Sequence, residues 1–250
     1  MTPLVSIITP CYNAASVIEQ TIVSVLNQTY TNWELLICDD CSTDNSAEII
    51  RKYVAMDDRV RYLTTTEPSG SPVKPRNIAI QEAKGGVIAF LDSDDVWLPT
   101  KLEEQIPLLK YSDTAIVYSN YEKINADGER AGRIIKAPLV TNYTNMLKGC
   151  VIGNLTGMYD VEKVGKIFCQ DVHQEDYLLW LTILKQGYTA RSTNTVTALY
   201  RVTGNSVSAN KYKTAIWQWN ILYNVEKLPF LTSVYCFISY AIKGILKAVK

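Results

Sequence analysis

The sequence predicts an α/β fold in which a doubly wound, mostly parallel sheet carries helices on both faces. Short apolar runs alternate with amphipathic stretches through roughly the first hundred residues. Continuous apolar runs are typical of strands buried on both faces, and parallel strands need a crossover that is usually a helix. Because such crossovers are right-handed, the alternation predicts a doubly wound topology.

The first half alternates strand and helix regularly. The strands are expected where apolar residues are continuous, and the helices where apolar residues recur every three or four positions. In order, we expect a strand over residues 5–9, a helix over 16–27, a strand over 34–38, a helix over 46–56, a strand over 60–63, a Pro/Gly/Ser-rich loop over 67–75, a helix over 76–83, a strand over 87–91 and a helix over 98–109.

The second half is mixed. In order, we expect a strand over 115–123, a turn at 125–128, a strand over 133–135, a helix over 175–185, a strand over 195–202 and a helix over 212–225. The turn between two strands indicates a hairpin. Gly187 ends the helix expected over 175–185. We predict one domain over residues 1–210, with a regular half over 1–110 and a mixed half over 111–210. A C-terminal helical extension (211–250) follows.

Composition excludes several classes of protein. Lys plus Arg number 25 and Asp plus Glu 25, so the 250-residue chain lacks the basic footprint of a nucleic-acid-binding protein. A single His excludes a site built from several His ligands. Cys38 and Cys41 form a C-x-x-C without the second pair of a zinc ribbon, so we expect reduced thiols. The N-terminus lacks signal-peptide features, which favours a cytoplasmic location.

Polar clusters follow three of the expected strands. They are the segments 10–13 (Pro-Cys-Tyr-Asn), 39–40 (Asp-Asp) and 92–95 (Asp-Ser-Asp-Asp). Ligands of doubly wound sheets bind beyond the carboxyl ends of the strands. The glycine loops that cradle phosphates elsewhere are missing, so clustered carboxylates predict a divalent cation that bridges to a diphosphate.

The cluster over residues 92–95 is the most informative. In an extended segment Asp92 and Asp94 point to the same side, where their carboxylates repel unless a cation or a shared proton compensates. The alternative is a solvated turn that caps the next helix. Asp40 has the same two interpretations, since it could make a turn or accept hydrogen bonds from a nucleobase or ribose.

Four blocks in order and spacing resemble the inverting family 2 glycosyltransferases of GT-A fold. They are VSIITPCYN (5–13), DDCSTDNS (39–46), the Arg-Asn pair at 76–77 and FLDSDD (90–95). The resemblance implies a GT-A glycosyltransferase domain over residues 1–210, with a nucleotide-sugar-binding half (1–110) and an acceptor half (111–210). It also implies a UDP-sugar donor held at the sheet edge. By motif, Pro10, Tyr12 and Asp40 would line the uracil pocket, and Asn13 would also contact the nucleotide-sugar. Arg76 would approach the nucleotide or its phosphates, and Asp92 and Ser93 would lie on the ribose or sugar side. Asp94 would hold Mn²⁺ or Mg²⁺.

The segment His173–Gln174–Glu175–Asp176 is similar to the Glu-Asp pair on the acceptor side of these enzymes. Displacement at an anomeric carbon needs a base on the incoming hydroxyl and stabilisation of the leaving diphosphate. We therefore predict Asp176 as general base, with Glu175 supporting it or contacting the acceptor. The alternative is an acidic helix N-terminus that complements the macrodipole. His173 could approach the metal or be structural.

The C-terminus indicates a membrane-linked acceptor. Residues 230–242 carry no charge but number only 13, short of the about 20 that span a bilayer. Lys243, Lys247 and Lys250 would form one helical stripe, and residues 211–250 hold six Lys against one Glu. This favours an in-plane helix on anionic lipid. The alternative is packing against the domain or a second copy in a homodimer.

The pattern also resembles bacterial transferases that build O-antigen, capsule or teichuronic-acid repeat units. The implied acceptor is a lipid-diphosphate-linked saccharide at the cytoplasmic face, which implies peripheral association with the inner face of the cell membrane. No Trp follows an Arg, so the Q-x-x-R-W motif of processive synthases is missing and one sugar per encounter is expected.

Three other functions share parts of this pattern. A polyprenyl-phosphate glycosyltransferase would share the donor half, but its anionic acceptor needs no base, so Asp176 favours a hydroxyl acceptor. A sugar-1-phosphate nucleotidyltransferase should have a Gly-rich turn after the first strand. A non-catalytic sugar-nucleotide-binding subunit predicts a broken D-x-D or base, whereas both are intact.

Overall fold

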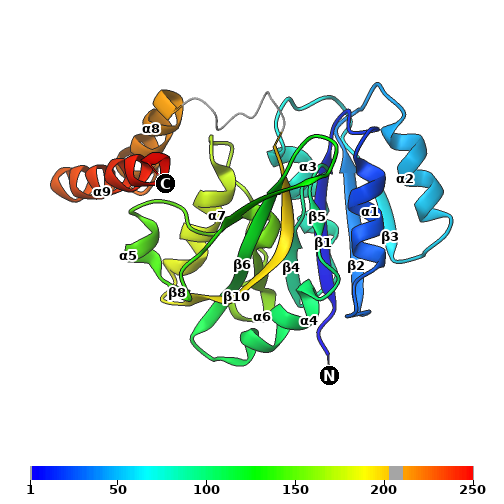
Figure 1. Cartoon of the computed structure of the whole chain (residues 1–250), viewed down its shortest axis with the longest axis horizontal. Coiled ribbons are helices and arrows are strands. Elements are labelled where there is room, and N and C mark those ends of the chain that lie inside the picture. Colours follow the sequence, from blue (N-terminus) through cyan, green and yellow to red (C-terminus); the bar gives the residue numbers. More distant parts are fainter. Residues whose placement is uncertain (1, 203–210, 250) are drawn as a thin grey trace.

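A ten-stranded sheet runs through the molecule and carries helices on both faces (Figure 1). The computed structural model describes residues 2–202 and 211–249, with side chains of the last helix as far as residue 244. The main strand order is β3-β2-β1-β4-β9-β6-β10-β5, with β7 paired to β6 and β8 to β10. The α/β fold predicted from the sequence is therefore confirmed.

The first four strands are parallel and form one end of the sheet. They are β1 (Val5–Cys11), β2 (Trp33–Asp39), β3 (Val60–Thr64) and β4 (Val87–Phe90), joined by α1 (Ile18–Leu26), α2 (Ser46–Val54) and α3 (Val73–Glu82). Strand order reverses between β1 and β4, because β2 lies on one side of β1 and β4 on the other. Such a reversal leaves a crevice at the carboxyl ends of the strands, where ligands bind.

The second half adds parallel and antiparallel strands. Its elements are β5 (Val96–Trp97), α4 (Lys101–Gln105), β6 (Thr114–Ile124), β7 (Arg130–Ile135), β8 (Val140–Thr141), α5 (Tyr143–Met146), β9 (Met158–Asp160), α6 (Val161–Val164), α7 (Glu175–Leu184) and β10 (Thr189–Arg201). The short strand β9 runs antiparallel between β4 and β6, whereas β10 is parallel to β6. The expected hairpin is confirmed as β6–β7.

Two expected helices differ in their bounds. The helix expected over 98–109 is α-helical only over Lys101–Gln105, and Ile106–Lys110 continues as a 3₁₀ helix. Pro107 has no N–H and its ring clashes with the preceding turn, so the α-helix cannot pass through it. Helix α3 begins at Val73 rather than at residue 76, because Pro75 lies in the first turn, where an N–H has no helical partner.

The buried strands separate two hydrophobic cores. Along β1, Val5 and Ile7 face the core beneath α1 and α2, whereas Ile8 faces the core beneath α3 and α7. Successive side chains of a strand point to opposite faces, so a continuous apolar run fills both cores. The strands that lead to the carboxyl edge of the sheet are therefore packed on both faces.

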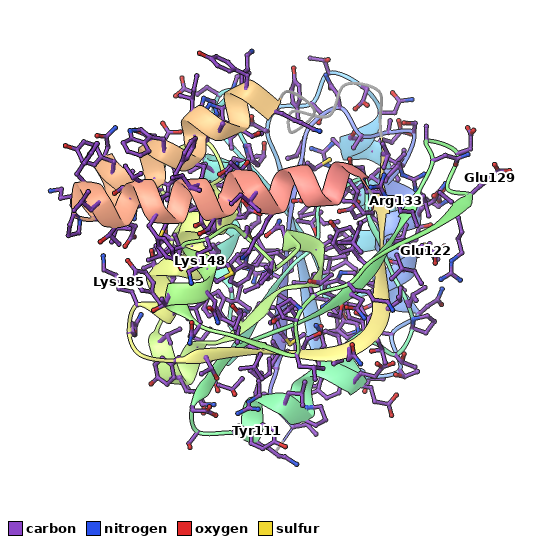
Figure 2. All side chains as sticks on the ribbon, turned by 60° about the vertical axis from the view of Figure 1, so that its left-hand side comes forward. Tyr111, Glu122, Glu129, Arg133, Lys148 and Lys185 are labelled. Atoms are coloured by element: carbon purple, nitrogen blue, oxygen red, sulfur yellow. The ribbon has the colours of Figure 1, made fainter. Side chains whose placement is uncertain are left out.

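The chain ends in what we call the C-terminal hairpin, residues 211–249. It consists of α8 (Lys211–Asn220), a π-helical segment (Ile221–Val225) and α9 (Phe230–Val249), and it lies at the opposite end of the molecule from α2 (Figure 1). Its inner side joins the core beside α7 through Ile221, Leu222 and Cys236. Figure 2 shows Lys148 and Lys185 along one side of α9. The domain packing expected as one alternative is therefore present on this inner side.

No helix within residues 2–202 and 211–249 combines the length and the apolar character needed to cross a bilayer. All six cysteines are free thiols, as expected.

Candidate active site

The loops after β1, β2 and β4 meet at the carboxyl edge of the sheet, and we call residues 10–13, 39–46 and 92–95 the donor edge. Pro10 is buried at the end of β1, whereas the Tyr12 ring after it is 57% exposed. Asn13 has a φ of 46°, a left-handed conformation that Asn tolerates better than most residues. Its side-chain Oδ1 accepts a hydrogen bond from the Thr43 N–H at 2.8 Å. Asn13 therefore ties the first loop to the second and leaves Tyr12 open to a ligand.

The two aspartates after β2 are buried and accept several hydrogen bonds. Asp39 Oδ1 accepts from the Ser42 hydroxyl, and Oδ2 accepts from the Tyr62 hydroxyl at 2.9 Å. Asp40 Oδ1 accepts from the Thr65 hydroxyl at 2.9 Å, and Oδ2 accepts from the Ser69 hydroxyl at 2.8 Å. Asp40, predicted for the uracil pocket, thus also fixes the loop before α3.

The loop after β4 is organised by its last aspartate. Asp95 is 1% exposed, and its Oδ1 accepts from the Arg201 N–H at 2.9 Å. The Thr21 hydroxyl lies 2.9 Å from the Ser93 carbonyl oxygen and 2.8 Å from that of Asp95. Asp92, Ser93 and Asp94 remain partly exposed, so this arrangement presents the first three residues of the cluster to solvent.

The Asp94 carboxylate lies near the like charge of Asp92, and the Arg201 charge offsets this repulsion only in part. Burial, together with the nearby Asp92 carboxylate, raises the pKa of Asp94. Among the described residues, no three acidic, His or Cys side chains converge on one point as a complete metal site. Magnesium is commonly held by one or two carboxylates, with substrate phosphates and water completing the coordination. Asp94 fits a cation of that type, because a bound cation would offset the repulsion from Asp92.

Arg76 joins the donor edge to α7. Its guanidinium is 3% exposed; Nη2 lies 2.9 Å from Asp92 Oδ1, and Nη1 lies 2.6 Å from Glu175 Oε1. Burial opposes the positive charge, but the two carboxylates raise the pKa of Arg76 overall. Arg76, predicted to approach the nucleotide, is therefore committed to two carboxylates, and it brings Glu175 to the donor edge.

The N-terminus of α7 carries the predicted acceptor-side residues, and we call residues 173–176 the acceptor segment. Burial and the adjacent Glu175 carboxylate raise the pKa of Asp176 to about 6, while Arg76 opposes that rise. Gln174, just before the helix, is left-handed with a φ of 64°. A carboxylate with a pKa near neutrality can accept a proton and release it again, as a general base must.

His173 contacts the C-terminal hairpin. Its ring stacks on the Trp217 ring of α8, with centroids 4.3 Å apart and planes inclined by 25°. Of the two interpretations left open by the sequence, this contact favours the structural one. It also connects the acceptor segment to the C-terminal hairpin.

Two supporting residues were not predicted from the sequence. Asn154 Nδ2 lies 3.2 Å from Asp92 Oδ2, and Arg201 Nε donates to the Asp94 carbonyl oxygen at 2.8 Å. Arg201 is 2% exposed at the end of β10. Arg201 could have been noticed in the sequence, because it directly follows the uncharged stretch 195–200. Nothing in the local sequence marked Asn154.

A hollow of about 600 Å³ lies beside α3, lined by Ser69, Lys74, Asn77, Phe168 and Asp171 among others. None of the predicted site residues lines it. The ion pairs that join the donor edge to α7, from Arg76 to Asp92 and to Glu175, lie outside the lining of this hollow.

The chain is similar to known proteins over nearly its whole length. The family model for glycosyl transferase family 2 matches residues 6–161. TuaG of Bacillus subtilis (strain 168), a glycosyltransferase named for teichuronic acid biosynthesis, is 40% identical over 98% of this chain and 97% of TuaG. WfgD of Escherichia coli, named as a UDP-Glc:alpha-D-GlcNAc-diphosphoundecaprenol beta-1,3-glucosyltransferase, is 40% identical over 98% of this chain and 94% of WfgD.

Solved structures share the architecture. S. aureus TarS 1-349 in complex with UDP-GlcNAc has a TM-score of 0.72 at 19% identity, covering 95% of this chain and 71% of that one. The mannosyltransferase PcManGT from Pyrobaculum calidifontis, in complex with GDP-Man and Mn²⁺, has a TM-score of 0.71 at 17% identity, covering 100% and 76%. At these identities the likeness shows the GT-A fold alone.

Proposed function

The chain belongs to glycosyltransferase family 2, and we propose that it transfers a hexose from a UDP-sugar to a hydroxyl group of a lipid-diphosphate-linked saccharide. Transfer inverts the anomeric centre, moves one sugar per encounter and serves bacterial surface-polysaccharide biosynthesis. The names of two relatives support this, since WfgD is a glucosyltransferase on GlcNAc-diphosphoundecaprenol and TuaG is named for teichuronic acid biosynthesis.

One structural observation carries the proposal. The buried Arg76 guanidinium contacts Asp92 of the donor edge and Glu175 of the acceptor segment at the same time. The carboxylate beside Glu175 is Asp176, whose pKa of about 6 suits a general base at neutral pH. These contacts support Asp176 as a base next to a nucleotide-sugar edge, the arrangement that single displacement at an anomeric carbon needs.

Asp176 accepts the proton of the acceptor hydroxyl as its oxygen attacks the anomeric carbon. The bond from that carbon to the diphosphate oxygen breaks, and UDP leaves with the electron pair. Glu175 stays paired with Arg76. The Arg76 charge opposes the rise in the pKa of Asp176 and so favours its ionised form. Attack from the face opposite the leaving group inverts the centre.

The donor edge holds the UDP-sugar. Pro10, Tyr12 and Asp40 line the uracil site, and Asn13 and Ser93 contact the nucleotide-sugar, as the motif implies. Asp94 holds Mn²⁺ or Mg²⁺, which when bound stabilises charge on the departing diphosphate. Two contacts refine this assignment, because Arg76 acts through Asp92 and Asp40 also fixes the loop of Ser69.

The test is Asp176→Asn in the full-length protein. UDP release is measured with UDP-glucose, Mn²⁺ and a GlcNAc-diphosphoprenol acceptor, after thermal-shift screening of other UDP-sugars. We expect kcat to fall roughly 10²–10⁴-fold, the usual contribution of a general base. UDP affinity, measured separately, should be unchanged.

Matched reactions separate the other functions. EDTA should abolish UDP release by the wild type. The control variant Asp160→Asn, which removes a carboxylate at the start of α6, should retain UDP release. Near wild-type transfer by Asp176→Asn would remove the base assignment. Transfer to a polyprenyl phosphate alone would favour the polyprenyl-phosphate enzyme, and UDP-sugar binding without any transfer would favour a non-catalytic subunit.

The C-terminal hairpin supports peripheral membrane association. Exposed apolar side chains lie on both helices and on the π-helical segment between them: Tyr212, Ile216, Tyr223, Phe230, Leu231, Tyr235, Ile238 and Ile242. On α9, Leu231, Tyr235, Ile238 and Ile242 follow helical spacing and so form one stripe. An apolar stripe of this kind suits insertion among lipid headgroups.

The charge of the hairpin is directed outward as well. Glu226, the one acid in residues 211–250, has a 5% exposed side chain and pairs with Lys185 at 2.8 Å. Lys211, Lys227 and Lys243 are exposed. Of the expected lysine stripe, the Lys247 side chain and Lys250 lie outside the described residues. The exposed positive charge fits an anionic lipid surface at the cytoplasmic face of the cell membrane.

Vesicle flotation tests this association. The double variant Leu231→Glu/Ile238→Glu should lose binding to vesicles rich in anionic lipid, whereas Met56→Glu, an equally exposed apolar site near α2, should keep it. Equal flotation of both variants would contradict the membrane proposal. Loss of a dimer in the double variant, without loss of flotation, would assign the face to a second copy.

A further inference from the structure

The turn at Gln174, within the acceptor segment, is not capped by the Gln174 side chain. Gln174, in the left-handed conformation at the start of α7, makes no side-chain capping bond. Its Oε1 is buried and has no hydrogen-bond partner in the part of the chain that the structure describes. A non-glycine residue in this conformation costs about 1–2 kcal/mol, so neighbouring parts of the protein must hold it.

Contacts on two sides supply that support. On one side, Arg76 Nη1 lies 2.6 Å from Glu175 Oε1. On the other, the Trp217 ring stacks on His173 with a centroid distance of 4.3 Å. A stacked aromatic pair contributes about 0.5–1.5 kcal/mol beyond the area it buries, which is comparable to the cost of the turn. The stack therefore offsets part of the cost of the Gln174 conformation, although His173 is exposed.

Trp217 itself is held in a fixed place against α7. The next residue, Gln218, is 1% exposed, and its Nε2 donates to the Tyr177 hydroxyl at 3.2 Å. Tyr177 in turn donates to the Met146 carbonyl oxygen at 2.8 Å. At the other end of α7, Lys185 pairs with Glu226 of the hairpin. The C-terminal hairpin thus contacts α7 near both of its ends, and it contacts the acceptor segment through the Trp217 ring.

We propose that Trp217 is a positioning residue for glycosyl transfer, which fixes Glu175 and Asp176 through its stack on His173. This inference rests on the proposed role of Asp176 as the base. It assigns the hairpin a second task besides contact with lipid, because the helix that presents an exposed face also shapes the acceptor side of the site. Trp217 touches no reacting atom and acts only through His173.

The experiment compares Trp217→Ala with Trp217→Phe in the full-length protein, using the donor and acceptor that the wild type turns over. Loss of the ring should lower kcat roughly 10- to 100-fold, the effect of a small misplacement of a catalytic group. The Phe variant keeps a stacking ring and should recover most of that loss. UDP affinity should not change in either variant, because the donor edge has its own hydrogen bonds.

The matched control is Trp219→Ala on the same helix. Trp219 packs within the hairpin against Tyr223, Phe230 and Phe237, and makes no ring contact with His173 among the described residues. It should cost stability but retain kcat at a temperature where the variant is folded. His173→Ala combined with Trp217→Ala should lower kcat no further than either change alone, since both remove the same stack.

The outcomes distinguish the two proposals. Wild-type kcat in Trp217→Ala, with Asp176→Asn inactive, would overturn the role of Trp217 and leave the base in place. Equal losses in Trp217→Ala and Trp219→Ala, or no recovery in Trp217→Phe, would also overturn it, since hairpin stability would then explain the effect. An active Asp176→Asn would instead overturn the proposed base, and the positioning role with it.

Discussion

The donor edge and the acceptor segment reach their shapes by different means. At the donor edge, carboxylates accept hydrogen bonds from their own or neighbouring loops, as Asp44 does from Ser46 and Asp40 from Ser69. The acceptor segment depends on Arg76, 99 residues before Glu175, and on a ring of the C-terminal hairpin. A substitution at the donor edge should therefore change one loop, whereas one at a support of the acceptor segment should change the segment as a whole.

The largest expected effect comes from Arg76→Met, since Arg76 is the joint between the two regions. Breaking a buried ion pair costs about 3–5 kcal/mol, and we expect roughly 3 because Asp92 is 34% exposed. Since Arg76 holds down the pKa of Asp176, the low-pH limb of the kcat profile should also shift upward from about 6. Urea unfolding and a pH–rate profile measure both.

Arg61→Met is the matched control, because Arg61 also pairs with two carboxylates, Glu34 and Glu82, but lies 25% exposed and outside the site. Its pH–rate profile should remain that of the wild type. An unchanged profile in Arg76→Met as well would mean that the two regions are independent.

The second prediction concerns stability and gives opposite signs for the two regions. Burial and Glu175 raise the pKa of Asp176 from 3.8 to about 6, so this carboxylate costs stability progressively from pH 3.8 to 6 and fully above that. Two pKa units correspond to about 3 kcal/mol, which partial exposure reduces to about 2. Asp176→Asn should therefore raise the free energy of unfolding by about 2 kcal/mol at pH 7 and scarcely at pH 4.

Asp44→Asn at the donor edge should instead lower the free energy of unfolding at pH 7. Burial opposes the change, but hydrogen bonds from Ser46 and Ala15 lower the pKa of Asp44, so its ionised form stabilises the fold above pH 3.8. Urea titrations at both pH values decide the matter. Equal signs for the two variants would contradict the contrast between the regions.

The smallest expected effect is that of Ser69→Ala, in the loop before α3 that contacts Asp40 of the donor edge. It removes the hydroxyl that donates to Asp40 Oδ2 and should cost about 1 kcal/mol, because the Ser69 N–H still reaches the same oxygen at 3.0 Å. Calorimetry should show weaker UDP binding in the presence of Mn²⁺, with kcat retained at saturating donor. Ser71→Ala in the same loop is the control, and a fall in kcat for Ser69→Ala alone would mean that this loop also shapes the acceptor segment.

The amino-acid sequence determined the parallel half of the sheet and the position of the donor edge. Apolar runs fix where buried strands begin and end, and parallel strands bring their carboxyl ends to one edge, so residues 10–13, 39–40 and 92–95 could be placed together from local patterns. The strands β5, β8 and β9 were missed, because two or three residues are too short to show a period. The break at Pro107 was visible in the sequence, but its consequence for α4 was not applied.

Tertiary structure alone decided how the two halves of the site meet. Nothing in the local sequence of Arg76 indicates that it would be buried between Asp92 and Glu175, and nothing near His173 indicates Trp217. Both contacts depend on where α3, α7 and α8 pack, and packing is set by the shapes of all the side chains in the core rather than by a repeating pattern. Residue periodicity specifies elements, whereas the ion pairs of Arg76 with Asp92 and Glu175 join residues far apart in the chain.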